Sequence, residues 1–237
     1  SNGKPGELIV VISDGQWEST LGQRVKSVFL AECIALPQPE PAFDVSHVNH
    51  KLFSDLLTRH RNVLLIKTGA AVNDVFYKKN IWASNQVVAE LQSSSEKETD
   101  LLLQKNSESL VRFFNSTELS RLEELNKKIR SPEIEQKLKQ KFGLTLIVPK
   151  NYFPAIENDH FVWLRNETPE LSQGIMIYSE DGKENFTDLE IKMKIDSVSS
   201  KYILGKNGGT FMRIEDLLPP QHIHKMVNDI QIVETKG

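Results

Sequence analysis

Short runs of Val, Ile and Leu alternate with longer segments of helical periodicity along the first part of the chain. Ser19 or Thr20 is placed to cap a helix that carries apolar residues at positions 21, 25, 28 and 29. Residues 49–60 repeat apolar positions at helical spacing and predict an amphipathic helix. Strands are predicted at residues 7–13, 43–48 and 61–67. Strand followed by helix is the opening of a layered α/β or α+β fold.

The middle of the chain predicts a strand pair and then a long helix. Residues 74–82 and 86–92 are rich in β-branched and aromatic side chains and are separated by a short polar turn. A helical pattern starts after the serines at 93–95 and continues to Ile129, and we place a break or kink in it at residues 115–117. We expect Leu119, Leu122, Leu125 and Ile129 to belong to its packed face.

The second half repeats this mixture of strands and helices. Ser131 and Pro132 start a helix that Gly143 ends. A further helix is predicted at residues 188–202, after a turn at 181–182. Strands are predicted at residues 144–148, 158–165, 174–179, 210–213 and 230–234.

These elements predict an α+β fold with mixed or antiparallel sheets covered by helices. Two related βαβ-like halves joined by the long helical arm remain open as an arrangement, although no sequence repeat aligns them. We divide the chain into a polar tether at residues 1–6, a first α+β half at 7–130 and a second at 131–237, with the second half packed as one unit with the first.

Two features between the first helix and the second strand constrain the chain. Prolines at positions 37, 39 and 41 predict a stiff, extended connector, although proline-rich segments also serve as ligands for aromatic grooves. Cys33 is the sole cysteine, so no internal disulfide forms, and we expect its thiol to be buried on an apolar helix face.

Charge and composition exclude some classes of function. The chain has 29 basic and 32 acidic residues, mixed along its length, whereas nucleic-acid binding normally requires a basic stripe. No apolar run approaches the roughly 20 residues that span a membrane. The glycine-rich residues 205–210 lack the order of a phosphate-binding loop and predict a plain turn, so we expect no nucleotide or other cofactor.

Histidines are the first candidates for catalysis. His47 and His50 lie three residues apart, which on a helix would place both rings on one face. No third ligand lies near them in sequence, so we predict no metal site. His160 is the remaining candidate for a catalytic site assembled from distant residues, and no serine-hydrolase elbow of the Gly-x-Ser-x-Gly type is present.

Three tryptophans are candidates for ligand binding, because flat aromatic rings stack on sugars and peptides. Trp17, Trp82 and Trp163 would line such a surface together with Tyr77, Tyr152 and Phe153. Aromatic residues at strand positions are more often part of the core, so the packing interpretation stays beside the binding one.

The proline-rich residues 36–43, with Trp17 upstream and residues 60–62 opening the next strand, resemble a family of uncharacterised Bacteroidetes envelope lipoproteins known only as a domain of unknown function. Residues 80–83, 86–88 and 112–115 are similar to the same family. The resemblance implies a leader peptide and a lipidated cysteine upstream of Ser1, with the chain facing the periplasm or the cell surface. It implies no activity, cofactor or catalytic residue.

We therefore expect a non-enzymatic envelope module that binds an unknown protein or envelope ligand or has a structural role. Its contact with the membrane would be only through the upstream lipid anchor, and no nucleic-acid partner is expected. The alternative is an envelope hydrolase whose site gathers distant His and Asp/Glu residues. A polar cleft around the histidines would favour the hydrolase, and an exposed apolar or aromatic patch would favour binding.

Overall fold

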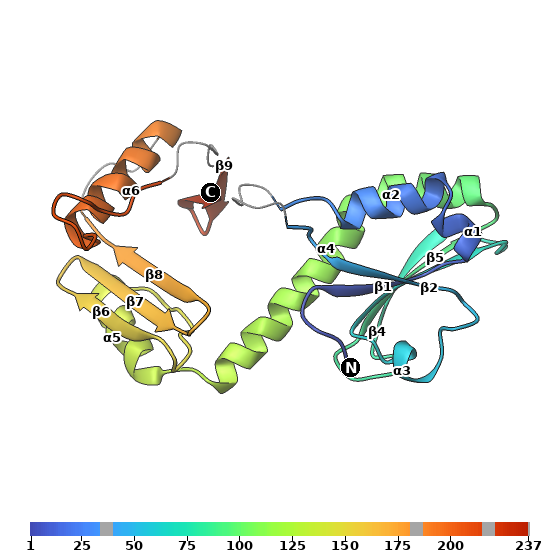
Figure 1. Cartoon of the computed structure of the whole chain (residues 1–237), viewed down its shortest axis with the longest axis horizontal. Coiled ribbons are helices and arrows are strands. Elements are labelled where there is room, and N and C mark those ends of the chain that lie inside the picture. The colour runs from blue at the N-terminus through green and yellow to red at the C-terminus, as the bar shows by residue number, and fades with distance from the viewer. Residues whose placement is uncertain (34–39, 181–186, 215–220, 237) are drawn as a thin grey trace. The chain divides into compact units, whose positions relative to one another are not determined.

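The computed structural model describes residues 1–33, 40–180, 187–214 and 221–236, and it confirms an α+β fold. The chain forms two compact units (Figure 1). Among the described residues, unit 1 comprises 1–33 and 40–123, and unit 2 comprises 124–180, 187–214 and 221–236. The connector expected at the prolines, and the turn expected at 181–182, lie at least partly outside the described residues.

Unit 1 is built on a five-stranded sheet in the order β2-β1-β3-β5-β4. β1, β2, β3 and β5 run parallel to one another, and β4 is an edge strand antiparallel to β5. These strands confirm the predictions made from the apolar runs in this part of the chain. Their bounds are Glu7–Val11 for β1, Asp44–Val48 for β2, Asn62–Thr68 for β3, Asp74–Lys79 for β4 and Val87–Ser93 for β5.

Helices cover one face of this sheet far more fully than the other. α2 (Thr20–Phe29) and α4 (Glu96–Lys128) pack on the first face, where Phe29, Phe43 and Phe114 meet at the centre of the larger core (Figure 1). The second face has a smaller core, which Phe53 and Leu57 cover from the segment around α3 (Asp55–Thr58). A four-residue helix, α1 (Asp14–Trp17), follows β1.

The predicted helix at residues 49–60 is wrong. Only α3 is helical there, and its first residue, Asp55, has a left-handed φ of 44°. This conformation interrupts a right-handed helix, so the apolar residues of the segment do not share one face that packs on the core. Leu52 and Leu56 are consequently 67% and 70% exposed.

Three further expectations for this half are wrong. Cys33 is exposed, because α2 ends at Phe29 and the cysteine lies beyond its apolar face. α4 runs from Glu96 to Lys128 without the break expected at residues 115–117, although Ser116 and Thr117 donate hydrogen bonds from their hydroxyl groups to the carbonyl of Phe113, a pattern that often bends helices. The four apolar residues from Leu119 to Ile129 that we expected to be packed are exposed.

Unit 2 has an antiparallel sheet in the order β6-β7-β8 and a separate hairpin, β9-β10. α5 (Pro132–Phe142) ends at Gly143 in the left-handed conformation, as predicted, and α6 (Asp188–Tyr202) also matches its prediction. Tyr202 stacks on Phe161. The strands are β6 (Phe153–Glu157), β7 (Phe161–Glu167), β8 (Ser172–Tyr178), β9 (Gln221–Val227) and β10 (Ile230–Lys236).

The strands predicted at residues 144–148 and 210–213 are wrong. In those segments the described chain has only isolated bridges near their ends, at Pro149 and Phe211. β6 was missed because Pro154 lacks an N–H and weakens a strand pattern, which edge strands tolerate. β9 was missed because its turn, Asn228–Asp229, takes left-handed φ angles without a glycine.

Candidate functional site

The parallel strands of unit 1 place one group of polar residues at their carboxyl ends. β2 and β3 flank β1 on opposite sides. The connection that follows β1 therefore runs toward one edge of the sheet, and the connection that follows β3 runs toward the other. Ligands of open α/β sheets bind outside the carboxyl ends at such a position. There the amide of Gln16 donates to Thr68 Oγ1 at 2.7 Å and accepts from Ser13 Oγ at 2.9 Å, so the two strands are joined by side chains.

His47 and Trp17 meet at the same edge, where their rings stack with centroids 4.8 Å apart. His47 Nε2 lies 3.0 Å from the carbonyl oxygen of Ile12 and 3.6 Å from an Asp14 carboxylate oxygen. A carbonyl oxygen only accepts hydrogen bonds, so Nε2 carries a proton and this nitrogen cannot abstract one. Lys26 lies 4.5 Å from the Trp17 ring, so the indole belongs to a packed group.

The other histidine candidates lie on other segments of the chain. His47 lies on β2 and His50 in the turn after it, so the expectation that both occupy one helix face is wrong. His160 is exposed in the turn between β6 and β7, in unit 2. A composite catalytic site from these residues stays a prediction. No three His, Cys, Asp or Glu side chains in the described part of the chain are placed to share a metal ion.

The remaining tryptophans occupy separate places. Trp82 lies in the turn before β5, at the amino ends of the parallel strands, where its ring meets the edge of Phe53 at 5.6 Å. Trp163 lies on β7 in unit 2, with the Arg165 guanidinium 4.8 Å from its ring. A Cβ on Gly174 would lie 2.8 Å from the Trp163 ring nitrogen, so the indole packs closely against backbone. Within unit 1, Trp17 therefore lies at the carboxyl ends of the parallel strands and Trp82 lies at their amino ends.

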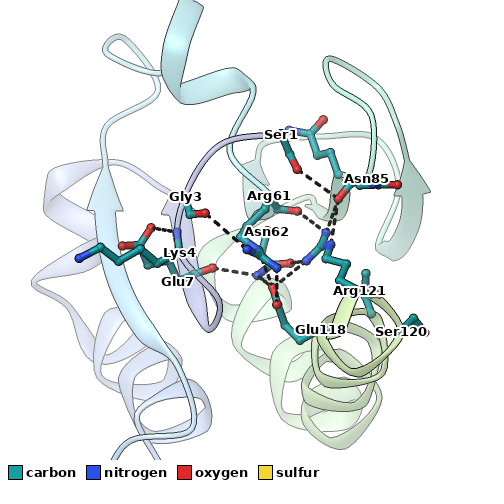
Figure 2. A network of polar contacts seen from close by, with 12 residues as sticks. Ser1, Gly3, Lys4, Glu7, Arg61, Asn62, Asn85, Glu118, Ser120 and Arg121 are labelled. Carbon is teal, nitrogen blue, oxygen red and sulfur yellow. Dashed lines mark hydrogen bonds and ion pairs between the residues drawn. The ribbon is translucent and has the colours of Figure 1, made fainter. Parts of the chain in front are cut away.

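A buried charged network lies at the amino ends of β1 and β3 (Figure 2). Glu118 of α4 accepts from Arg61 at 2.6 and 2.9 Å and from Arg121 at 2.6 Å. The amide of Asn62 donates to Glu118 and to the carbonyl of Glu7, and its oxygen accepts from Arg121. Burial lowers the pKa of Arg121, whereas the Glu118 charge raises it. These charges satisfy one another, so the network joins α4 to the sheet.

A second buried charge lies on the sheet face that has few helices. Glu90 on β5 is 3% exposed and accepts from Lys67 at 2.6 Å and also from Lys78. Burial alone would raise its pKa, but the hydrogen bonds from Lys67, Lys78 and Gln92 outweigh that effect and lower the pKa to about 2. Lysine stems rather than a helix therefore cover this part of the face.

Unit 2 contains a groove of about 170 Å³ between α5 and the strands β6 and β7. Its floor is apolar and comes from Leu138, Val162 and Leu164, which are 1–3% exposed. Phe153, which is 48% exposed, and Pro154 also line it. The complete lining is Ser131, Glu133, Ile134, Lys137, Leu138, Lys141, Tyr152, Phe153, Pro154, Glu157, Val162 and Leu164.

The charged residues around this groove balance one another. Lys137 lies 3.1 Å from Glu133, one helical turn away, and Lys141 lies 3.3 Å from Glu157 on β6. The hydrogen bond and charge of Glu133 raise the pKa of Lys137. Each ammonium group has a carboxylate partner, so these four residues together give the rim of the groove no net charge. Sequence reasoning named Tyr152 and Phe153 here but missed α5, whose contribution depends on folding.

Comparison with known families gives two matches along the chain. A family model described as a domain of unknown function (DUF8532) matches residues 1–127, and another, also described as a domain of unknown function (DUF4837), matches residues 131–237. No curated protein and no solved structure matches the chain. The expectation of an uncharacterised domain-of-unknown-function family is confirmed. Because the first model covers more than half of the residues, the chain belongs to the DUF8532 family of domains of unknown function.

Proposed function

We propose that the chain is a non-enzymatic binding module whose groove in unit 2 receives one apolar side chain of a partner protein. The observation that carries this proposal is the combination of an apolar floor with a charge-balanced rim. Binding sites are typically concave and apolar, with a few polar groups that fix orientation. A cavity of about 150 Å³ lined by apolar residues accommodates benzene in another protein, so a volume near 170 Å³ suits a phenylalanine or leucine side chain.

The described contacts of His47 hold its ring in place and do not present its Nε2 atom as a general base. A general base must present an unprotonated atom to the proton it removes. His47 Nε2 faces the Ile12 carbonyl, and the ring is stacked on Trp17. These contacts give the imidazole a packing role in unit 1. They supply no observation in favour of the hydrolase alternative.

We further propose that the module works in a bacterial cell envelope, attached through a lipidated cysteine upstream of Ser1 and facing the periplasm or the cell surface. The resemblance to Bacteroidetes envelope lipoproteins, at Trp17 and at residues 36–43, 60–62, 80–83, 86–88 and 112–115, supports this setting. Fractionation of cells that express the full-length gene tests it. Recovery with the envelope, in a form that detergent releases, is the expected result, and recovery in the cytosolic fraction would contradict it.

The groove is tested by titration with N-acetyl-phenylalanine-amide, followed through NMR signals of the methyl groups on its floor. A single buried apolar side chain contributes about 2–3 kcal/mol, so this isolated probe should bind more weakly than about 1 mM. Saturable shifts are expected at the methyl groups of Leu138, Val162 and Leu164. N-acetyl-alanine-amide, which has too little apolar surface, should leave these signals unchanged.

A blocking variant and a matched control separate groove binding from surface adsorption. Ile134→Trp places a larger side chain in the groove and should abolish the shifts. Leu189→Trp adds the same ring at a position on α6 that is 67% exposed and should leave them unchanged. Equal shifts in the two variants would overturn the assignment of the groove.

A further inference from the structure

Unit 1 exposes four large apolar side chains on two neighbouring loops. Leu52 and Leu56 belong to the segment around α3 and are 67% and 70% exposed. Ile81 and Trp82 belong to the turn between β4 and β5 and are 42% and 40% exposed. We call these four residues the Trp82 patch. Exposed apolar groups of this size on adjacent loops typically mark an interaction surface.

Buried contacts hold the two loops together. The Gln86 side chain is 1% exposed, and its amide donates to the carbonyls of Thr58 at 2.6 Å and His60 at 2.7 Å. Its oxygen accepts from the backbone N–H of Trp82 at 3.1 Å. The ring contact between Trp82 and Phe53 joins the same loops. The two loops that carry the patch are therefore fixed to each other at their base.

Backbone geometry explains why these side chains are not part of the core. Asp55 interrupts the segment 49–60 with a φ of 44°, and Asn80 starts the other loop with a φ of 55°. Non-glycine residues rarely adopt such angles, which reverse the chain direction within a few residues. The inward positions of the α3 segment are taken by Phe53 and Leu57, and Leu52 and Leu56 are left outward.

The charges beside the patch are mainly positive. Lys51 and Arg59 flank Leu52 and Leu56, and Lys79 precedes the second loop; all three are exposed. Within the described ranges, none of these three cations forms an ion pair. Asp55 is the acidic residue in the same segments. The patch is thus locally basic in a chain whose net charge is −3.

We propose that unit 1 docks on an anionic lipid surface through the Trp82 patch. This inference goes beyond the proposed groove function and does not depend on it. Tryptophan favours the boundary between lipid and water, aliphatic side chains enter the acyl region, and lysine and arginine contact anionic headgroups. Four apolar side chains are few beside the 20–30 residues a side of a stable protein interface, but they suffice for shallow insertion.

Vesicle co-sedimentation of the 237-residue chain tests the proposal. Association is expected with vesicles that contain phosphatidylglycerol and not with vesicles of phosphatidylcholine alone, and it should weaken as salt rises. Leu56→Asp should lower the association about tenfold because it removes an inserting side chain. Lys51→Ala should lower it about fivefold, since each basic residue near an anionic surface contributes about that factor.

The control is Leu119→Asp, which introduces the same change at a leucine of α4 that is 66% exposed and lies outside the patch. Its vesicle association should equal that of the wild type. Equal losses in Leu119→Asp and Leu56→Asp would overturn the proposal, as would no association with phosphatidylglycerol vesicles. Dimerisation that Leu56→Asp abolishes, without vesicle binding, would assign the patch to a second copy and also overturn it. Ile134→Trp, which should no longer bind N-acetyl-phenylalanine-amide, should still associate with vesicles as the wild type does.

Discussion

Unit 1 holds two largely buried carboxylates, each of which is paired with basic side chains. Glu118 and Glu90 are both largely buried, and each accepts hydrogen bonds from two basic side chains. A buried carboxylate in such a setting is strongly coupled to its partners, because removing one member leaves an uncompensated charge. The two residues therefore differ from the exposed ion pairs around the groove of unit 2 in what they contribute to stability.

Glu118→Gln should destabilise the chain by about 3 kcal/mol, because the guanidinium groups of Arg61 and Arg121 would face each other without the carboxylate. The unfolding midpoint in urea measures this effect. Glu133→Gln is the matched control, since Glu133 is 79% exposed in its pair with Lys137 and should barely change the midpoint. Similar midpoints for the two variants would show that the network is solvated.

Glu90 should make stability depend on pH in the acid range. Its pKa in the folded chain is about 2, against an ordinary value of 4.5, so folding favours the ionised form. The resulting stabilisation is present above about pH 5 and is lost as pH falls toward 2, with a total of about 3 kcal/mol. The free energy of unfolding of wild type and Glu90→Gln, measured across this range, should converge at low pH. A difference that stays constant with pH would contradict the burial of this charge.

At the scale of elements, close approach of backbone fixes the start of α2 against α1. A Cβ on Gly22 would lie 1.8 Å from the carbonyl oxygen of Trp17. Gly22→Ala should therefore push the two helices apart, weaken the stacking of Trp17 on His47, and cost about 1–3 kcal/mol. Thermal unfolding measures the loss. Gly15→Ala, where a Cβ would meet open space, should show no comparable loss, and equal effects would contradict the tight contact.

Elements whose signals are local were predictable from the sequence. The strands of unit 1 and the helices α2, α5 and α6 follow from apolar periodicity and from caps such as Ser19 and Gly143. The prediction of a helix at residues 49–60 was wrong because the apolar positions have helical spacing, whereas the left-handed backbone of Asp55 interrupts the helix. Periodicity reports which conformation would bury the apolar residues, and it does not report the backbone angles imposed by neighbouring segments.

The candidate sites were less predictable than the elements. Phe153 and Tyr152 were singled out as aromatic residues, but their partner Leu138 comes from a helix 14 or more residues away in sequence. The Trp82 patch needed the buried contact of Gln86 with Thr58, which no local pattern reveals. Side chains distant in sequence define both surfaces, so only the folded chain brings them together.

At the scale of the whole molecule, the two family matches and the two structural units agree in outline. The matches meet between residues 127 and 131, and the units divide between Glu123 and Glu124, within α4. No helix among the described residues is long and apolar enough to cross a membrane. The apolar groove lies in unit 2 and the Trp82 patch in unit 1, so each of the two matched regions has its own surface to test.

The most direct test of the account is to locate a bound apolar probe on the full chain. Intermolecular NOEs from the ring of N-acetyl-phenylalanine-amide should reach the methyl groups of Leu138, Val162 and Leu164, because these side chains form the groove floor. That result would place the ligand between α5 and β7. NOEs confined to other side chains, or none at a probe concentration that saturates the shifts, would contradict the central claim that this groove is a binding site.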